Sequence, residues 1–185
     1  LFKPNDSRYI YAMSQGGNVG MVDRKTGSNK FIKPVNTKDD TPLRFHWNAA
    51  IAQNPFEECG LYFGSQFVHK SMDCGESWEI ISPDLTTNDK SKQKQEESGG
   101  ISVDNSGAEN HCTIFTIAES PMDEKVIWVG TDDGNIQVTQ DGGKSWTNTT
   151  ANLPDNVPDN TWVYHIEASV HGKGTAYAVL EGHTT

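Results

Sequence analysis

The sequence has no long apolar run. A membrane-spanning helix needs about 18 or more consecutive apolar residues, and the longest runs here, such as that at 126–129, have only the length of a strand. Residues 1–6 lack the apolar segment of a secretory signal peptide. The chain does not begin with Met, so we expect a mature, cut or cloned piece of a longer protein.

Basic residues are outnumbered by acidic ones. The chain has 15 Lys and Arg against 25 Asp and Glu, a formal net charge of −10. Nucleic-acid binding depends on clustered Lys and Arg that neutralise phosphates. The one basic run, at 90–94, is followed at once by two glutamates, which is typical of a solvated loop. We therefore expect no nucleic-acid partner.

Metal-binding and catalytic signatures are also missing. The three cysteines are an odd number and contain no CxxC pair, and the six histidines show no HExxH or His-x-His spacing. The sequence has no Ser-His-Asp pattern, no GxSxG pattern and no phosphate loop. We expect no metal and no cofactor.

What the sequence does contain is a repeat. Residues 51–65 align without a gap on residues 117–131, and identical Ile, Ala, Pro, Glu and Gly occupy matching places. Two weaker copies add Tyr11 and Tyr177 to the matching Tyr62 and Trp128. These four aromatic residues follow one another at intervals of 51, 66 and 49 residues. A unit of about 50 residues without helical periodicity suits a four-stranded propeller blade. The predicted class is all-β.

A second motif lies inside the repeat, [ST]-x-D-x-G-x-S-W, at 71–78 and at 139–146. In such a hairpin turn the Asp accepts backbone N–H bonds, the Gly adopts a positive φ and the Trp packs between sheets. We assign this structural role to Ser71, Asp73, Gly75, Trp78, Thr139, Asp141, Gly143 and Trp146.

This motif resembles the Asp-box, or BNR repeat, of sialidases, two-propeller xyloglucanases, sortilin-like VPS10 propellers and photosystem assembly factors. Three phrases look like bacterial sortilin-like proteins also described as glycosyl-hydrolase-like: those at 9–17, 81–86 and 128–135. The resemblance covers nearly the whole chain. It implies an extracytoplasmic protein (secreted, periplasmic or at the cell surface) whose parent has many more blades.

We predict that residues 1–185 are a partial β-propeller of three to four blades that does not close a ring. The blade segments are expected at 1–34, 43–85, 111–150 and 160–185, with a mobile loop inserted at 86–111. The chain would begin after the first strand of one blade and end after the second strand of another. Open sheet edges invite pairing, so the expected partners are the remaining blades or another chain.

The connections of the predicted strands sort into two faces. Cys59 and Cys74 fall on the same face of one blade, where either a disulfide or two free thiols fits. The opposite face is where Asp-box enzymes bind substrates, and there we expect Arg44, His46, Gln66, His111, Asn160 and Trp162. Asp132 and Asp133 are the only candidate acids, although a Thr-Asp-Asp-Gly-Asn turn explains them equally simply. Trp47 and Trp162 lie on inner strands, where either sugar stacking or core packing fits.

The sequence favours binding over catalysis. A sialidase needs three converging arginines, and of the three Arg in the chain only Arg44 lies on the substrate face. The first hypothesis is a non-catalytic binding or scaffold segment that recognises protein, peptide or glycan. The alternative is that the chain is part of a xyloglucanase-like glycoside hydrolase completed by other blades. Hydrolysis would then require a second carboxylate about 5–9.5 Å from Asp132 or Asp133. Assembly scaffolding, visible as stable oligomers, is a third hypothesis.

Overall fold

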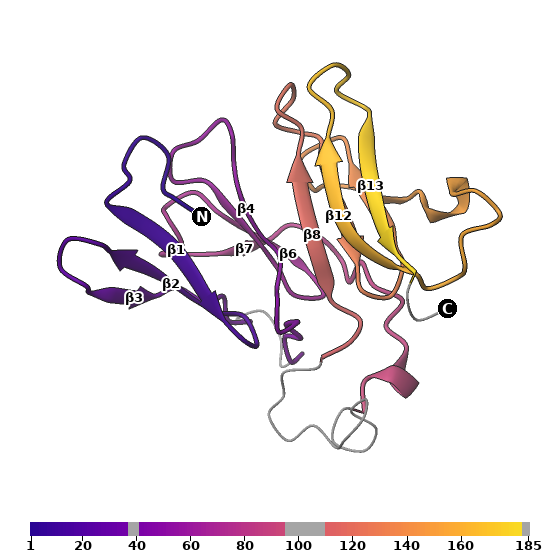
Figure 1. The fold of residues 1–185 in the computed structure, drawn as a ribbon, viewed down its shortest axis with the longest axis horizontal. Helices are drawn as coiled ribbons and strands as arrows, with labels where there is room; N and C mark the ends of the chain where they lie inside the picture. Colours follow the sequence, from indigo (N-terminus) through magenta and orange to yellow (C-terminus); the bar gives the residue numbers. More distant parts are fainter. Residues whose placement is uncertain (37–40, 95–109, 183–185) are drawn as a thin grey trace.

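The computed structural model describes residues 1–36, 41–94 and 110–182. Within them the chain forms antiparallel sheets, which confirms the predicted all-β class (Figure 1). Sheet 1 has the order β1-β2-β3, sheet 2 β4-β5-β6-β7, sheet 3 β11-β10-β9-β8 and sheet 4 β12-β13. The strands are β1 (Tyr9–Ser14), β2 (Asn18–Asp23), β3 (Asn29–Phe31), β4 (Ile51–Gln53), β5 (Leu61–Gly64), β6 (Val68–Ser71), β7 (Glu79–Ile80), β8 (Ile114–Glu119), β9 (Ile127–Thr131), β10 (Ile136–Thr139), β11 (Thr147–Asn148), β12 (Trp162–Ala168) and β13 (Ala176–Glu181).

The blade segment expected at 43–85 begins its first strand later than its own start. β4 covers only Ile51–Gln53, because a turn at 47–48 interrupts the segment before it. As expected, sheet 1 has three strands, and no named strand precedes β1 in the described part of the chain. Leu1 exchanges backbone hydrogen bonds with Tyr11, and the N–H of Lys3 donates to the carbonyl of Tyr9, so this short segment meets β1 through an isolated bridge between Phe2 and Ile10.

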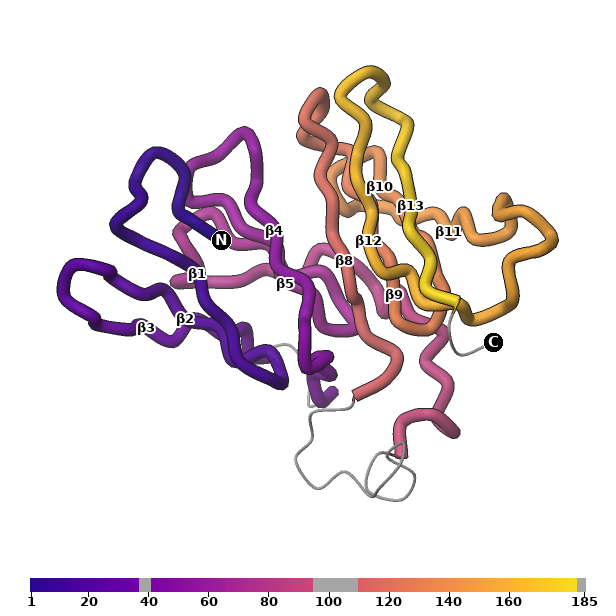
Figure 2. The backbone as a smooth tube through the Cα atoms, in the orientation of Figure 1, coloured from indigo at the N-terminus to yellow at the C-terminus, as the bar shows by residue number. Residues whose placement is uncertain are grey.

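The sheets follow one another in space as they do in sequence, as the tube in Figure 2 shows. Three clusters of buried side chains fill the spaces between neighbouring sheets. Tyr11 and Phe63 belong to the cluster between sheets 1 and 2, Tyr62 and Val129 to the next, and Val163 and Ile166 to the third. β5 is buried at all four positions, because both of its faces pack against a neighbouring sheet.

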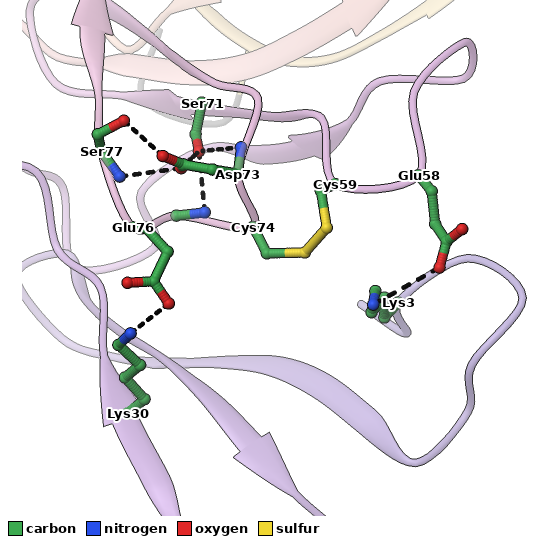
Figure 3. The surroundings of a disulfide bond; sticks show 10 residues. Lys3, Lys30, Glu58, Cys59, Ser71, Asp73, Cys74, Glu76 and Ser77 are labelled. Carbon is green, nitrogen blue, oxygen red and sulfur yellow. Dashed lines mark hydrogen bonds and ion pairs between the residues drawn. A yellow bond between two sulfur atoms is a disulfide. The ribbon is translucent and has the colours of Figure 1, made fainter.

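The two repeated turns at 71–78 and 139–146, which we call the repeat turns, have the same hydrogen bonds. In the first, Asp73 accepts from the backbone N–H of Ser77 (2.9 Å) and from its hydroxyl (2.6 Å). The hydroxyl of Ser71 donates to the carboxylate of Asp73 and accepts from the N–H of Gly75, and each distance is 2.8 Å. These bonds belong to the network in Figure 3. The corresponding residues of the second turn, Thr139, Asp141, Gly143 and Ser145, repeat these four bonds within 0.1 Å.

Each repeat turn also clamps its sheet to the preceding one. The indole N–H of Trp78 donates to the carbonyl of Ile32 (2.7 Å), and that of Trp146 donates to the carbonyl of Ile81 (3.0 Å). Gly75 has a φ of 89°, and a Cβ there would lie 2.6 Å from the Ile32 side chain. Glycine therefore serves both the left-handed backbone and the close approach.

Cys59 and Cys74 form a disulfide in the structure, with Cα atoms 4.3 Å apart (Figure 3). The bond joins the turn between β4 and β5 to the first repeat turn, and the backbone N–H of Cys74 also donates to the carbonyl of Cys59. The third cysteine, Cys112, is a buried free thiol. The disulfide therefore ties the two turns at one end of sheet 2 together.

Two short 3₁₀ helices complete the described elements, η1 (Lys90–Lys92) and η2 (Thr150–Asn152). Of the loop predicted at 86–111, residues 95–109 lie outside the described residues. In the part of the chain that the structure describes, no helix has the length and apolar character needed to cross a membrane.

Candidate functional site: an aromatic cluster on the first strands

Aromatic rings gather where the first strands of sheets 2, 3 and 4 meet. β8 contacts both β4 and β12, and β8 and β12 lie side by side in Figure 1. Rings from β8, from β12 and from the segments before β4 and β8 form a continuous set of contacts, which we call the aromatic cluster: His46, Trp47, His111, Phe115, Trp162 and Tyr164.

His46 lies at the centre of the aromatic cluster. Its ring centroid is 4.9 Å from that of Phe115 and 5.5 Å from that of Trp162, both in edge-on contact. His46 is buried, and its Nδ1 accepts a hydrogen bond from the backbone N–H of Asn48 (3.1 Å). Burial, together with nearby His111, lowers the pKa of His46 to about 4. The imidazole is therefore neutral at pH 7 and packs as one more aromatic ring.

The cluster turns two rings toward solvent. Trp47 is 54% exposed and Tyr164 is 53% exposed. The ring of Phe115, on β8, connects these groups: its centroid is 5.8 Å from that of Trp162 and 5.6 Å from that of Tyr164. Trp162 and Tyr164 both contact Phe115, although the pairing register of β12 shifts between Val163 and His165. The result is a surface with a base of buried and half-buried rings and an exposed aromatic rim, which can stack against a ligand.

Three residues predicted on the ligand face lie in this cluster: His46, His111 and Trp162. The ring of His111 is 6.5 Å from that of Trp162, and its Nδ1 is 3.9 Å from a carboxylate oxygen of Asp132. Its Nε2 is buried and has no hydrogen-bond partner among the described residues. Burial lowers the pKa of His111, with Asp133 acting in the opposite direction.

Arg44 and Gln66, also predicted there, hold the scaffold together instead. The guanidinium of Arg44 donates to the carbonyl of Cys112 (3.1 Å) and to the carboxylate of Asp84 (2.9 Å). Gln66 is fully buried; its side chain accepts from the backbone N–H of Arg44 and donates to the carbonyl of Pro42, both over 2.8 Å. These contacts join the segment before β4 to sheets 2 and 3.

Asn160, the remaining predicted residue, lies outside the cluster. It is exposed and has a φ of 60°. Its backbone packs so closely on Gly134 that a Cβ at that glycine would lie 2.7 Å from the Asn160 Cα. Asn160 therefore shapes the connection that leads into β12.

The two candidate acids are buried and hydrogen-bonded. Asp132 accepts from the backbone N–H of Thr113 (2.9 Å) and from its hydroxyl (2.6 Å). Asp133 accepts from the backbone N–H and hydroxyl of Thr87 (2.8 and 2.7 Å) and from the hydroxyl of Thr131 (2.6 Å). Burial raises the pKa of Asp132 to about 7. In this chain both carboxylates brace the connections around β8 and do not face solvent.

Phe115 and Tyr164 were missed as candidate site residues. Both residues lie on the first strand of a sheet, next to core residues along the strand. Their matching places in the repeat were the signal that could have identified them. Among the described residues, no group of three or more His, Cys, Asp or Glu side chains is arranged to hold a metal ion.

No protein-family model matches the chain. No curated protein matches it either. Solved structures do. The chain superimposes on a GH74 enzyme of Niastella koreensis with a TM-score of 0.56 and 18% identity over 97% of this chain. A GH74 xyloglucanase of Xanthomonas campestris gives 0.54 and 17% over 89%, and an auxiliary nutrient binding protein of Bacteroides thetaiotaomicron gives 0.57 and 9% over 97%.

These alignments cover only part of each solved chain. The 185 residues span 25% and 24% of the two GH74 chains and 35% of the nutrient binding protein. Identities this low carry information about the fold and not about ligand or activity. Together with the antiparallel sheets, of which two have four strands, they show that the chain is an all-β segment built from β-propeller blades.

Proposed function

We propose that this chain is a non-catalytic binding segment of an extracytoplasmic, sortilin-like Asp-box propeller, and that it binds a glycan at the aromatic cluster. The observation that carries the proposal is the exposed rim of the cluster, where Trp47 and Tyr164 are each about half exposed beside buried His46 and the half-buried rings of Phe115 and Trp162. Single exposed aromatic residues are common on protein surfaces, but a contiguous group marks a binding surface.

The chemistry of the rim favours a sugar. Aromatic faces carry partial negative charge, and they attract the weakly positive C–H groups on the flat face of a pyranose ring. The side chains at the base present no charge to the ligand at neutral pH, because burial keeps His46 neutral. Protein and peptide remain in the proposal as the second ligand class, since aromatic rims also receive apolar side chains.

The disulfide supports an extracytoplasmic location. Stable structural disulfides are typical of secreted, periplasmic and cell-surface proteins and are rare in the reducing cytosol. Cys59 and Cys74 are joined in this way. The proposed partners of the chain are the remaining blades of a larger propeller or a second polypeptide.

The alternative is that the chain is part of a glycoside hydrolase whose catalytic pair is completed by other blades. Hydrolysis needs two carboxyl groups that flank the scissile bond. Asp132 and Asp133 are buried and already accept hydrogen bonds from threonine residues, which argues against catalysis by this chain alone. Binding without hydrolysis is therefore the function we favour.

The test is calorimetric titration of the chain with neutral oligosaccharides and, separately, with a panel of peptides. We expect saturable binding of at least one oligosaccharide, weakened about tenfold by Trp47→Ala or Tyr164→Ala, because each substitution removes a stacking face. Tyr177→Ala is the matched control, because Tyr177 is 64% exposed but belongs to β13, away from the cluster.

Three outcomes discriminate the hypotheses. Peptide binding that depends on the same two residues would change the ligand class and keep the site. Oligosaccharide binding that is equally sensitive to Tyr177→Ala would contradict the assignment of the site. Release of new reducing ends from the bound oligosaccharide would favour the glycoside hydrolase.

A further inference from the structure

In the part of the chain that the structure describes, the first two spaces between neighbouring sheets are each closed by a tryptophan of a repeat turn, and the third space is not. In the first space, Trp78 of the first repeat turn packs against the buried cluster and donates to the Ile32 carbonyl. In the second space, Trp146 packs in the same way and donates to the Ile81 carbonyl. An indole from the following sheet thus closes each of the first two spaces.

The acceptor has an equivalent in sheet 3. Ile32 and Ile81 each directly follow the outer strand of their sheet. Their N–H groups donate to the carbonyls of Val19 and Val68, respectively, each at a distance of 3.0 Å. Thr149 follows β11 in the same manner, and its N–H donates to the carbonyl of Ile136 over 2.8 Å. Thr149 therefore occupies the position that receives the indole in the other two spaces.

At this third position the structure has a groove. A cavity of about 480 Å³ lies beside Thr149, and its apolar walls come from sheet 3, sheet 4 and the connection between them at 152–157. Its lining includes Trp128, Ile136, Leu153, Ile166, Ala178 and Leu180. Among the described residues no indole of a repeat turn packs against the third cluster, whereas Trp78 and Trp146 pack against the clusters of the first two spaces.

Two further features suit the groove to a hairpin. The indole N–H of Trp128, in its wall, is buried and has no partner among the described residues. β13 is the outer strand of sheet 4 in the described part of the chain, so its outer edge offers backbone groups to another strand. The carbonyl of Thr149 already accepts from the N–H of Asn152 (2.9 Å), but a carbonyl oxygen has a second lone pair.

We propose that this groove docks a β-hairpin carrying a repeat turn of the form [ST]-x-D-x-G-x-S-W, supplied by a polypeptide segment outside these 185 residues. The hairpin pairs with β13, and its Trp fills the groove and donates to the carbonyl of Thr149. A second copy of this chain is a poor donor, because both of its own repeat turns are already docked through Trp78 and Trp146. The inference stands on a different surface from the aromatic cluster.

The test uses the whole chain and a synthetic peptide with the sequence of residues 135–149, which contains both strands and the turn of one such hairpin and no cysteine. Binding is measured by the fluorescence anisotropy of a dye on the peptide. We expect saturable binding that is at least about tenfold weaker for the same peptide with Trp146→Ala, since most of the apolar contact comes from the indole.

A pair of protein variants locates the binding. Ala178 lines the groove and Val179 is its neighbour on the opposite face of β13, where it is 54% exposed. Ala178→Asp is expected to weaken peptide binding by about tenfold or more, because it places a charge against the indole. Val179→Asp should leave the affinity within about twofold.

Several results would overturn the proposal. One is the absence of saturable binding by the unmodified peptide; another is equal affinity for the Trp and Ala peptides, a comparison that does not depend on whether Ala178→Asp folds. Equal losses in the two protein variants would place the peptide elsewhere. Light scattering that shows a dimer of the chain alone, abolished by Ala178→Asp, would assign the groove to a second copy.

Discussion

The phenolic hydroxyl of Tyr62 donates a hydrogen bond to Oε1 of Glu119 over 2.7 Å, and this bond joins sheet 2 to sheet 3 inside the protein. The residues are 57 positions apart. Asn54 donates to the same hydroxyl, whereas Oε2 of Glu119 is buried without a partner among the described residues. A carboxyl group is thus held between two sheets with only one of its two oxygens hydrogen-bonded among the described residues.

The Glu119 carboxyl makes stability depend on pH. Burial raises its pKa to about 7, while the bond from Tyr62 acts in the opposite direction. Because the folded pKa lies above the unfolded value, the contribution to stability is fully present below the unfolded pKa, near pH 4.5, and is lost as the pH rises through about 7.

We expect Glu119→Gln to remove this loss, because the amide keeps an acceptor for Tyr62 and does not ionise. The free energy of unfolding of the variant, relative to the native sequence, should rise by up to about 3 kcal/mol between pH 4.5 and pH 8. Urea unfolding at several pH values measures it. A difference that stays constant across this range would show that Glu119 is not the responsible group.

Loss of the disulfide should destabilise sheet 2. The bond closes a loop with a sequence separation of 15 residues, for which the chain-entropy argument gives about 3 kcal/mol. We expect the double variant Cys59→Ser, Cys74→Ser to unfold at a lower temperature by several degrees. Scanning calorimetry with and without reductant checks this, since reductant should lower the Tm of the native sequence and leave that of the double variant unchanged.

The indole hydrogen bonds should be worth similar amounts in both repeat turns. Trp146→Phe keeps most of the apolar contact but removes the donor to the Ile81 carbonyl, at an expected cost of about 1 kcal/mol or more. Trp78→Phe should cost a comparable amount, because its bond to Ile32 is equivalent. Trp47→Phe serves as the control in the same unfolding experiment; Trp47 is exposed, so a large effect there would undermine the comparison.

Close packing at Gly130 should make it intolerant of a methyl group. A Cβ there would lie 2.4 Å from Cγ1 of Val163 and 2.7 Å from Cγ2 of Thr116, so sheets 3 and 4 would have to move apart. We expect Gly130→Ala to cost about 1–3 kcal/mol. Gly174→Ala, where no heavy atom of the described residues lies within 4 Å, should change the stability by less than about 0.5 kcal/mol. Equal effects in chemical denaturation would contradict this packing argument.

Local sequence patterns predicted the strands and turns well. The apolar run at 126–129, which has the length of a strand, lies almost entirely in β9 (Ile127–Thr131). The motif at 139–146 forms the turn expected of it, with Asp141 accepting from Ser145. These features depend on residues close in the sequence, such as a carboxylate and an N–H group four positions apart. Physical rules for short segments are sufficient to find them.

The orientation of polar side chains on the predicted ligand face was beyond such rules. Arg44 pairs with Asp84, 40 residues away, and Gln66 is enclosed by the segment that carries Arg44. Whether such a side chain faces solvent or a neighbouring sheet depends on which distant segment lies across from it. A single strand pattern does not contain that information.

By itself the sequence determined the all-β class, the repeat of about 50 residues and the two turns that clamp each sheet to the one before it. Only the tertiary structure decided that His46, Phe115 and Trp162 share one cluster, and that a groove remains beside Thr149. The reason is physical. Turns and strands form from local backbone and side-chain preferences, whereas sites arise where sheets far apart in the sequence pack together.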